Sequence, residues 1–366
     1  MLVLSPTDEE RALRIHREAT VIDTLTAYNI CTSNMLKCRD DLIARDADVP
    51  TILMEMDRLA TQSPVELEPA WEELRQASGV NAVSKTVGTF GWRTFTYESA
   101  ITDIAGWIRR FDAVERLVKV RKSHDIARAV EQDKFGVILN FQNTTHIGSD
   151  LDKLDFFYNL GIRIIQLTYN QRNLVGDGCT ERTDCGLSRF GLEVVERMNK
   201  LGILVDVSHC GHQTTMDAIE ASEVPVAVTH STAKAVHYHD RGKTDEILEA
   251  LAKRGGYFGV VAVPFLITNS TTPTLEHFLD HVDHVVKVMG VDKVGVGTDW
   301  DAELGELLLT GGRAQGDVSC IRTQGYDSLR DFPNITRGLV SRGYSDGEIK
   351  GMLGGNFLRL FKQVVG

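Results

Sequence analysis

Two neighbouring stretches of the chain decide the fold: residues 202–212 are GILVDVSHCGH, and residues 225–232 are PVAVTHST. In each stretch an apolar, β-branched run ends on a histidine, His209 in the first and His230 in the second. A continuous apolar run is typical of a strand that is buried on both faces, as in a parallel sheet. The two stretches therefore predict parallel strands whose carboxyl ends each carry an imidazole.

Six more runs of this kind occur along the chain, each followed by a polar or glycine-rich turn and a helical pattern. Eight strand–helix units in sequence predict an α/β protein with a (β/α)8 TIM barrel. An open doubly wound sheet is the rival fold, but the residues 20–29, TVIDTLTAYN, lack its glycine-rich phosphate loop. The eight expected strands are residues 20–23, 80–87, 136–141, 162–167, 203–207, 225–229, 257–262 and 294–298, and the amphipathic helices are 99–122, 190–201, 245–253, 275–289 and 328–341.

Composition limits the class of protein. Hydrophobic residues make up 42% and charged residues 25% of the 366 residues, which excludes a disordered or fibrous chain. We expect a single barrel domain over residues 1–366, with an N-terminal helical extension and closing C-terminal helices. The formal charge of −11 and the absence of a lysine/arginine block argue against nucleic acid and anionic membranes as partners.

Segments that direct a protein to a membrane or out of the cell are not apparent. No apolar run approaches ~18–20 residues, and the first residues lack the basic region of a signal peptide. Six cysteines without CxxC spacing predict free thiols in a reducing, cytoplasmic compartment. A bond between Cys179 and Cys185, which share one loop, is the alternative.

In a TIM barrel the chemistry lies where the strands end, at the carboxyl-terminal rim. Adjacent parallel strands lie ~4.8 Å apart, so the two imidazoles can reach one point above the barrel mouth. A divalent metal held there would polarise a carbonyl and acidify a bound water. Other polar residues follow the remaining strands: Gln142 and Asn143 after the third, Tyr169 after the fourth, Arg241 in the loop after the sixth and Asp299 after the eighth.

Each of these residues has a candidate role and a plainer alternative. Gln142 offers a carbonyl oxygen as a third metal ligand. Asp299 can move a proton between water and a leaving amine, or simply cap the next helix. Arg241 can clamp a substrate carboxylate, or form a surface salt bridge. Tyr169 can contact substrate or pack against the barrel. The other histidines on helical patterns are expected to be solvated: His16, His124, His277, His281 and His284.

Five segments together resemble the membrane (renal) dipeptidase family, peptidase family M19, among the amidohydrolase-like metal-dependent barrels. The resemblance extends over nearly the whole chain. It is carried by FYNLGIRIIQLTYNQRN (157–173), GLSRFGLEVVERMNKLGILVDVSHCG (186–211), PVAVTHSTAKAV (225–236), DKVGVGTDWDA (292–302) and RGYSDGEIKGMLGGNFLRLF (342–361).

The resemblance implies a metal-dependent hydrolase with two zinc sites at the rim. His209 and His230 match the histidines that hold the second zinc. Tyr169 stands where the family has a substrate-binding histidine, Arg241 matches its substrate-contacting arginine, and Asp299 matches its proton-handling acid. We expect Asn143 to contact substrate beside them.

The chain departs from the family pattern at the first zinc site. Leu25-Thr26-Ala27 replaces its His-x-Asp pair, and Gln142 replaces its bridging glutamate. The resemblance therefore implies at most one weakly held divalent metal, zinc by preference, bound by His209, His230 and Gln142.

Three hypotheses for function remain. The first is a hydrolase of a small amide or dipeptide that carries a carboxylate. The second is a metal-free lyase or isomerase that uses the histidines and Asp299 as acid and base. The third is a non-catalytic protein that binds a carboxylate ligand. The sequence leaves a homodimer open.

Overall fold

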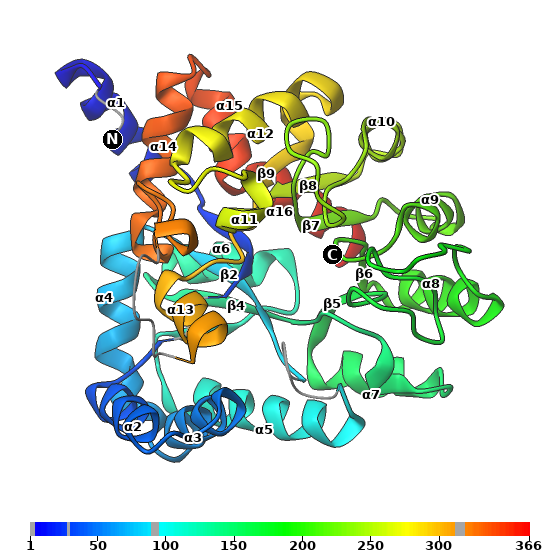
Figure 1. The fold of residues 1–366 in the computed structure, drawn as a ribbon, viewed down its shortest axis with the longest axis horizontal. Helices are drawn as coiled ribbons and strands as arrows, with labels where there is room; N and C mark the ends of the chain where they lie inside the picture. The colour runs from blue at the N-terminus through cyan, green and yellow to red at the C-terminus, as the bar shows by residue number, and fades with distance from the viewer. Residues whose placement is uncertain (1–3, 28–29, 89–94, 312–318) are drawn as a thin grey trace.

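Eight parallel strands form the barrel, and a ninth short strand lies beside it (Figure 1). The computed structural model describes residues 4–27, 30–88, 95–311 and 319–366. The strands are hydrogen-bonded in the order β1-β2-β4-β5-β6-β7-β8-β9, and β3 pairs with β4 outside this path. Their bounds are β1 Ile22–Thr26, β2 Ala82–Thr86, β3 Leu117–Lys119, β4 Phe135–Phe141, β5 Ile162–Gln166, β6 Leu204–Asp206, β7 Ala227–Ser231, β8 Tyr257–Val260 and β9 Val294–Val296.

The barrel closes between β1 and the residues that follow β9. The backbone N–H of Asp299 donates to the carbonyl oxygen of Leu25 at 2.9 Å. Thr298 adds two bonds to the buried carboxylate of Asp23, one from its backbone N–H at 2.8 Å and one from its hydroxyl at 2.7 Å. These bonds join the first and last strands, and the predicted TIM-barrel class is confirmed.

The structure confirms a strand within or overlapping each of the eight predicted ranges, and it corrects one helix. The pattern over residues 99–122 predicted one long helix, but α5 ends at Ala113 and β3 follows it. The apolar positions Val114 and Leu117 continue the helical spacing, but both are buried outside the helix, and Leu117 is the first residue of β3.

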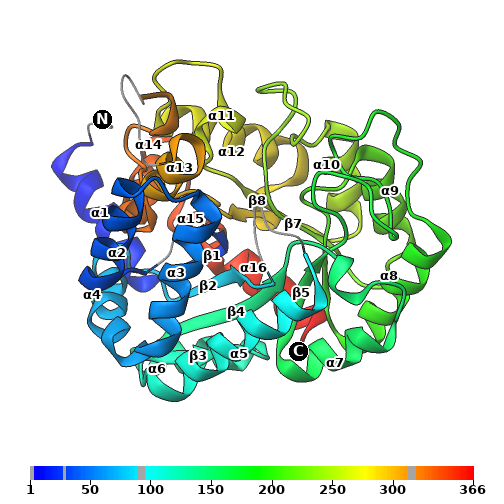
Figure 2. The same cartoon turned by 60° about the horizontal axis from the view of Figure 1, so that its bottom comes forward.

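The helices surround the barrel, and the N-terminal helix α1 packs against α14 near the end of the chain (Figures 1 and 2). Helices α2, α3 and α4 lie between β1 and β2 in sequence and were not predicted. The bounds are α1 Pro6–Glu18, α2 Ser33–Ala44, α3 Val49–Gln62, α4 Glu68–Ser78, α5 Tyr97–Ala113, α6 Ser123–Glu131, α7 Asp152–Leu160, α8 Arg189–Leu201, α9 His212–Ala221, α10 Asp245–Lys253, α11 Pro264–Ile267, α12 Leu275–Met289, α13 Ala302–Thr310, α14 Phe332–Ser341, α15 Asp346–Lys350 and α16 Asn356–Val364.

The residues at the two ends of helix α8 set where the helix begins and ends, and so where strand β6 starts. Its N-cap is Ser188, whose hydroxyl accepts the backbone N–H of Gly191 at 2.9 Å. It ends at Leu201, and the residue that follows, Gly202, has a φ of 73°, in the left-handed region that favours glycine. The chain then turns directly into β6, at whose carboxyl end His209 lies.

The core has two parts. The larger part lies between the outer faces of the strands and the surrounding helices. The smaller part lies at the amino-terminal ends of the strands, where Phe357 and Phe361 of α16 pack against barrel residues such as Ile22 and Tyr257. Helix α16 thus covers one end of the barrel with apolar side chains, and the polar strand-end residues are at the opposite end.

The structure also bears on the expectations for the cysteines, for two of the histidines and for membrane-spanning helices. All six cysteines are free, so Cys179 and Cys185 do not form a disulfide. The prediction that His16 and His281 are solvated is wrong, because both are buried with both ring nitrogens hydrogen-bonded to protein groups. In the part of the chain that the structure describes, no helix is both long enough and apolar enough to cross a bilayer.

Candidate functional site

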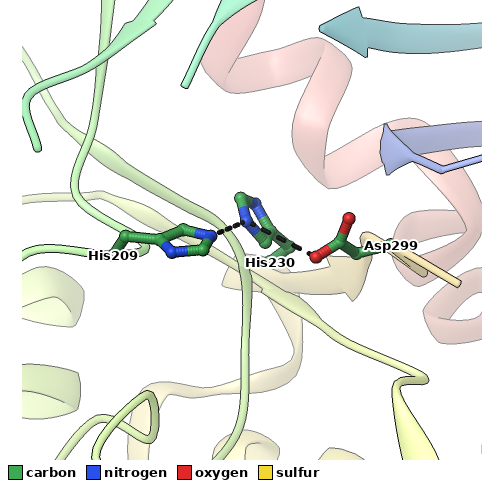
Figure 3. A group of neighbouring side chains, drawn as sticks. All are labelled: His209, His230 and Asp299. Atoms are coloured by element: carbon green, nitrogen blue, oxygen red, sulfur yellow. Dashed lines mark hydrogen bonds and ion pairs between the residues drawn. The ribbon is translucent and has the colours of Figure 1, made fainter. Parts of the chain in front are cut away.

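The side chains of His209, His230 and Asp299 converge at the carboxyl-terminal end of the barrel (Figure 3). The Nε2 atoms of the two histidines are 2.9 Å apart. The Nε2 atom of His230 lies 3.8 Å from Oδ2 of Asp299. One ligand atom from each of the three residues lies within 4.8 Å of the other two.

Each side chain is positioned by the end of a different strand. His209 follows β6, His230 lies within β7, and Asp299 follows β9. Asp299 has a φ of 48°, a left-handed conformation that a non-glycine residue rarely adopts. Such conformations are concentrated at functional sites, where the surrounding structure holds them. Asp299 does not cap the next helix, because Asp301 accepts the N–H of Leu304 at the start of α13.

A buried network fixes the ring of His230. Its Nδ1 atom lies 2.8 Å from the hydroxyl oxygen of Thr229. That hydroxyl donates its hydrogen to Oδ2 of Asp206 at 2.7 Å, and Ser208 donates its own hydroxyl hydrogen to Oδ1 of the same carboxylate. The Thr229 oxygen therefore accepts from His230, whose hydrogen must be on Nδ1.

The ring of His209 is held in the same tautomer as that of His230, by a different partner. Its Nδ1 atom lies 2.7 Å from Oδ1 of Asn170, and an amide oxygen can only accept. The ring of Tyr169 stacks on the imidazole with centroids 4.3 Å apart and an interplanar angle of 20°. The hydrogen of His209 is therefore on Nδ1 as well.

These tautomers leave two bare Nε2 lone pairs facing each other. At 2.9 Å the lone pairs of His209 and His230 repel unless a cation or a shared proton lies between them. Burial, and next the guanidinium of Arg241, hold the pKa of both imidazoles well below the usual range, which disfavours the proton. Two Nε2 atoms beside a carboxylate are a common ligand set for a divalent transition metal. The residues present therefore fit a metal ion.

Asp299 has a carboxyl group suited to carrying a proton near neutral pH. Burial raises its pKa to about 7, against an opposing effect of the Arg241 and Lys85 charges. Its side chain keeps 16% of its surface exposed, whereas the side chain of His230 has none. Asp299 and Gln142 both line a cavity of about 200 Å³. Of the three converging side chains, Asp299 is the one that lines this cavity.

Arg241 is a buried residue of the site wall, so the surface salt-bridge alternative is wrong. Its guanidinium donates to the carbonyl oxygen of Ser208 and, at 3.2 Å, to that of His230. The two carbonyls belong to the segments that carry the two histidines. Arg241 thus ties the ends of β6 and β7 together, and its role as a carboxylate clamp stays a prediction.

The structure places the remaining predicted residues at the same rim with protein partners. The carboxamide of Gln142 donates to the hydroxyl of Thr86 at 2.8 Å. Asn143 accepts a hydrogen bond from Asn173 at 2.8 Å through its side-chain oxygen. Among the histidine, cysteine and acidic side chains of the described structure, the residues grouped closely enough to hold a metal ion are His209, His230 and Asp299. Roles for Gln142 in metal binding and for Asn143 and Tyr169 in substrate binding stay predictions.

Sequence reasoning missed the residues that orient the imidazoles. Asp206, Ser208 and Thr229 lie within the two strand-end motifs, so polar residues in an otherwise apolar strand were the available signal. Asn170, next to Tyr169, gave no comparable signal, because its partner is 39 positions away.

The comparisons with known proteins agree with this architecture. The profile of the family described as membrane dipeptidase (Peptidase family M19) matches residues 10–365. The chain belongs to peptidase family M19. The description of this family is that of a dipeptidase family. Among curated relatives, Dipeptidase verJ of Clonostachys rogersoniana is 31% identical over 252 residues, which cover 68% of this chain and 61% of that protein.

A second curated relative, Dipeptidase tcpJ of Claviceps purpurea, is 27% identical and is covered over 56% of its length. The chain thus spans less than two thirds of these two relatives. Among solved structures, an amidohydrolase from Pseudomonas aeruginosa is 27% identical, with a TM-score of 0.76 and 96% of this chain and 98% of that chain covered. A metallopeptidase from Rhodobacter sphaeroides is 17% identical with a TM-score of 0.71, covering 94% of this chain and 99% of that chain, and shows the shared fold.

Proposed function

We propose that this M19 hydrolase cleaves a small amide, a dipeptide or an N-acyl amino acid with a free carboxylate, with one divalent metal at His209, His230 and Asp299. The observation that carries the proposal is the pair of bare Nε2 atoms, 2.9 Å apart and 3.8 Å from a carboxylate oxygen in the case of His230. Zinc is the metal we favour, because imidazole and carboxylate are ligands of catalytic zinc sites.

A divalent ion at this position would supply Lewis-acid polarisation of the amide carbonyl and a more acidic water. Side chains of the protein transfer the proton and position the metal ligands. Asp299 takes a proton from water through one carboxylate oxygen and delivers it to the nitrogen of the departing amine. Thr229 and Asn170 hold the two imidazoles in the required tautomer, and Arg241 fixes the spacing of the strand ends that carry them.

The loss of the first zinc site lowers the negative charge of the rim. Ala27 and Gln142 stand where the family has carboxylates, so Asp299 is the one acidic side chain grouped with the two histidines in the described structure. Fewer anionic ligands mean weaker metal binding, so we expect the ion to be removed by moderate concentrations of chelator.

A metal-free acid–base enzyme is the second candidate. It is favoured by one observation: Asp299 lines the cavity, whereas the side chain of His230 has no exposed surface. In that case Asp299 alone exchanges protons with the substrate, and the histidines support the strand ends.

An assay with and without metal separates the two candidates. Protein treated with chelator and then supplied with Zn²⁺, Mn²⁺ or Co²⁺ is tested on a panel of dipeptides and N-acyl amino acids. The proposal predicts release of the amine that depends on added metal. Full activity after exhaustive chelation would support the second candidate, and no hydrolysis of any member under any condition would contradict the first.

A further inference from the structure

An open groove lies on the outside of the barrel near the amino-terminal ends of β4 and β5, beside β3 and α6 (Figure 2). We call it the β3–α6 groove. It shares no lining residue with the cavity that Asp299 lines. Although the formal charge of the chain is −11, six cationic side chains and two carboxylates line the groove: Lys119, Arg121, Lys122, Arg128, Lys134 and Arg163, with Asp112 and Asp125.

The positive charge of the β3–α6 groove is largely unpaired. In the part of the chain that the structure describes, Arg128 is the one cation of the six that forms an ion pair, with Oδ1 of Asp125 at 2.9 Å. The other oxygen of this carboxylate accepts the backbone N–H groups of Arg121 and Lys122, at 2.8 and 3.0 Å. Both oxygens of Asp125 are therefore already used, and five cations are left without a carboxylate partner.

Arg163 is the buried cation of the groove, with 5% of its surface exposed. Its Nε donates to the carbonyl oxygen of Arg121 at 2.9 Å, and its Nη1 donates to those of Tyr158 and Ile162 at 2.7 and 2.8 Å. Its Nη2 donates to no group in the described structure, and it is not one of the fully buried atoms that lack a partner, so it keeps surface toward the groove. Neutral carbonyls leave the charge of the guanidinium uncompensated, and a buried charge of this kind costs free energy.

Two further cations offer donors at the same groove. The side chains of Arg121 and Lys134 line it, and neither forms a hydrogen bond or an ion pair within the described residues. Burial, and next the charges of Arg121 and Arg163, lower the pKa of Lys119, so the cations are close enough to repel one another. An anion bound among them would relieve this repulsion.

The donors match the acceptors of a phosphate group. A phosphate monoester carries nearly two negative charges and three strong acceptor oxygens, so it can accept from Arg163, Arg121 and Lys134 together. A carboxylate has one charge and two oxygens and would leave more of the positive charge unpaired. A long polyanion such as nucleic acid fits less well, because the rest of this acidic chain would repel the phosphates that extend beyond the groove.

We propose that the β3–α6 groove binds a phosphate group, carried by a small phosphorylated molecule or present as the free ion. Nη2 of Arg163 contacts the phosphate from the wall of the groove, and Arg121 and Lys134 contact it from the surface. The site is remote from the strand ends that carry His209 and His230, so it does not rest on the proposed function.

Isothermal titration calorimetry at fixed ionic strength tests the proposal, on protein treated with chelator so that no metal ion competes for phosphate. The probes are glycerol 3-phosphate and inorganic phosphate, with acetate for comparison. The wild-type chain should bind both phosphate probes saturably, and acetate at least about tenfold more weakly. Tighter binding of glycerol 3-phosphate supports a phosphorylated molecule as the ligand, and equal binding supports the free ion.

The double variant Arg121→Gln/Lys134→Gln removes two cations that have no side-chain partner in the described structure. It should weaken both phosphate probes at least about tenfold, the contribution of one charged hydrogen bond. Arg17→Gln/Lys253→Gln makes the same change of charge at two exposed positions outside the groove and should bind as the wild type does. If the groove variant does not fold, Arg121→Gln alone decides, because Arg121 is exposed.

Three results would overturn the inference: no saturable binding of either phosphate probe, unchanged affinity in the groove variant, or an equal loss in the control variant. A single-stranded oligonucleotide serves as a further probe. If it binds more tightly than both phosphate probes and loses affinity in the groove variant, the choice of a small ligand is wrong.

Discussion

Thr229 donates its hydroxyl hydrogen to Oδ2 of Asp206 over 2.7 Å, and this buried bond decides the state of the neighbouring imidazole. With its hydrogen committed, the Thr229 oxygen can only accept from Nδ1 of His230. The opposite nitrogen of the ring is then free to bind a cation. The carboxylate of Asp206 therefore acts on the candidate metal site through Thr229 and His230, although Asp206 is not in the group of potential ligands.

Thr229→Val removes this acceptor while keeping the volume of the side chain. Loss of a hydrogen bond to a metal-binding histidine typically lowers metal affinity about 10–100-fold, and we expect a loss in that range. Competition with a chromophoric chelator measures it. Thr102→Val is the matched control, because the hydroxyl of Thr102 donates to the carbonyl oxygen of Glu98 in its own helix, α5, and the change should leave affinity unchanged. Equal affinity in both variants would show that the tautomer is not set by Thr229.

Asp299→Asn should reduce turnover by about 10²–10⁴-fold, the usual contribution of a general acid–base group. The amide keeps the size of the side chain but cannot take up a proton. Steady-state hydrolysis at saturating metal measures the loss. Asp292→Asn, an exposed change before β9, serves as the control. Wild-type rates in Asp299→Asn would exclude the proton-transfer role.

Gln142→Glu restores the carboxylate that the family has at this position. If the side chain faces the metal, the new charge should tighten binding at least about tenfold. The same chelator competition reports the change, with the exposed Gln62→Glu of α3 as a charge-matched control. Unchanged affinity relative to that control would remove Gln142 from the site.

His281 gives a pH dependence of stability that is independent of the metal. Its burial, opposed by a hydrogen bond to Ile267, lowers its pKa from 6.5 to about 4. Between these values the unfolded chain binds more protons than the folded chain, so this contribution to stability is present above pH 6.5 and is lost as the pH falls toward 4. The loss amounts to at most about 3.5 kcal/mol at about 1.4 kcal/mol per pKa unit.

Urea unfolding of wild-type and His281→Gln chains between pH 4 and pH 8 measures this effect. The wild-type free energy of unfolding should fall more steeply on acidification than that of the variant. Parallel curves would mean that His281 titrates normally in the folded protein.

Gly297 lies where the barrel wall approaches the strand that carries His230. A Cβ at this position would lie 2.0 Å from the carbonyl oxygen of Thr229 and 2.7 Å from the hydroxyl of Thr24. Gly297→Ala should therefore destabilise the chain by about 3 kcal/mol or more, because backbone must move. Gly347→Ala, where nothing lies within 4 Å, should change stability by about 1 kcal/mol or less. Thermal unfolding of both variants tests the contrast.

The barrel could be predicted from sequence because strands buried on both faces leave a local signal, a continuous apolar run such as residues 257–262. Strand β3 could not, because residues Leu117–Lys119 are too short and follow α5 without a change of spacing. Helices α2, α3 and α4 were missed because they form an insertion between two strands, outside the repeating pattern.

The three converging side chains of the site could be predicted because strand ends in a barrel meet at one rim. The contacts that decide their chemistry could not. The bond between His209 and Asn170 and the position of Arg163 in the β3–α6 groove depend on residues that tertiary packing brings together. Arg241 shows the same limit, since its sequence context left a carboxylate clamp and a surface salt bridge equally open, and only packing shows that the residue is buried.

The most direct test of the central claim is anomalous diffraction from crystals grown with Zn²⁺. The account predicts one strong peak about 2.0–2.1 Å from Nε2 of both His209 and His230, with an oxygen of Asp299 at about 2.0–2.2 Å. A barrel mouth without such a peak, or a zinc ion bound away from the two Nε2 atoms, would contradict it.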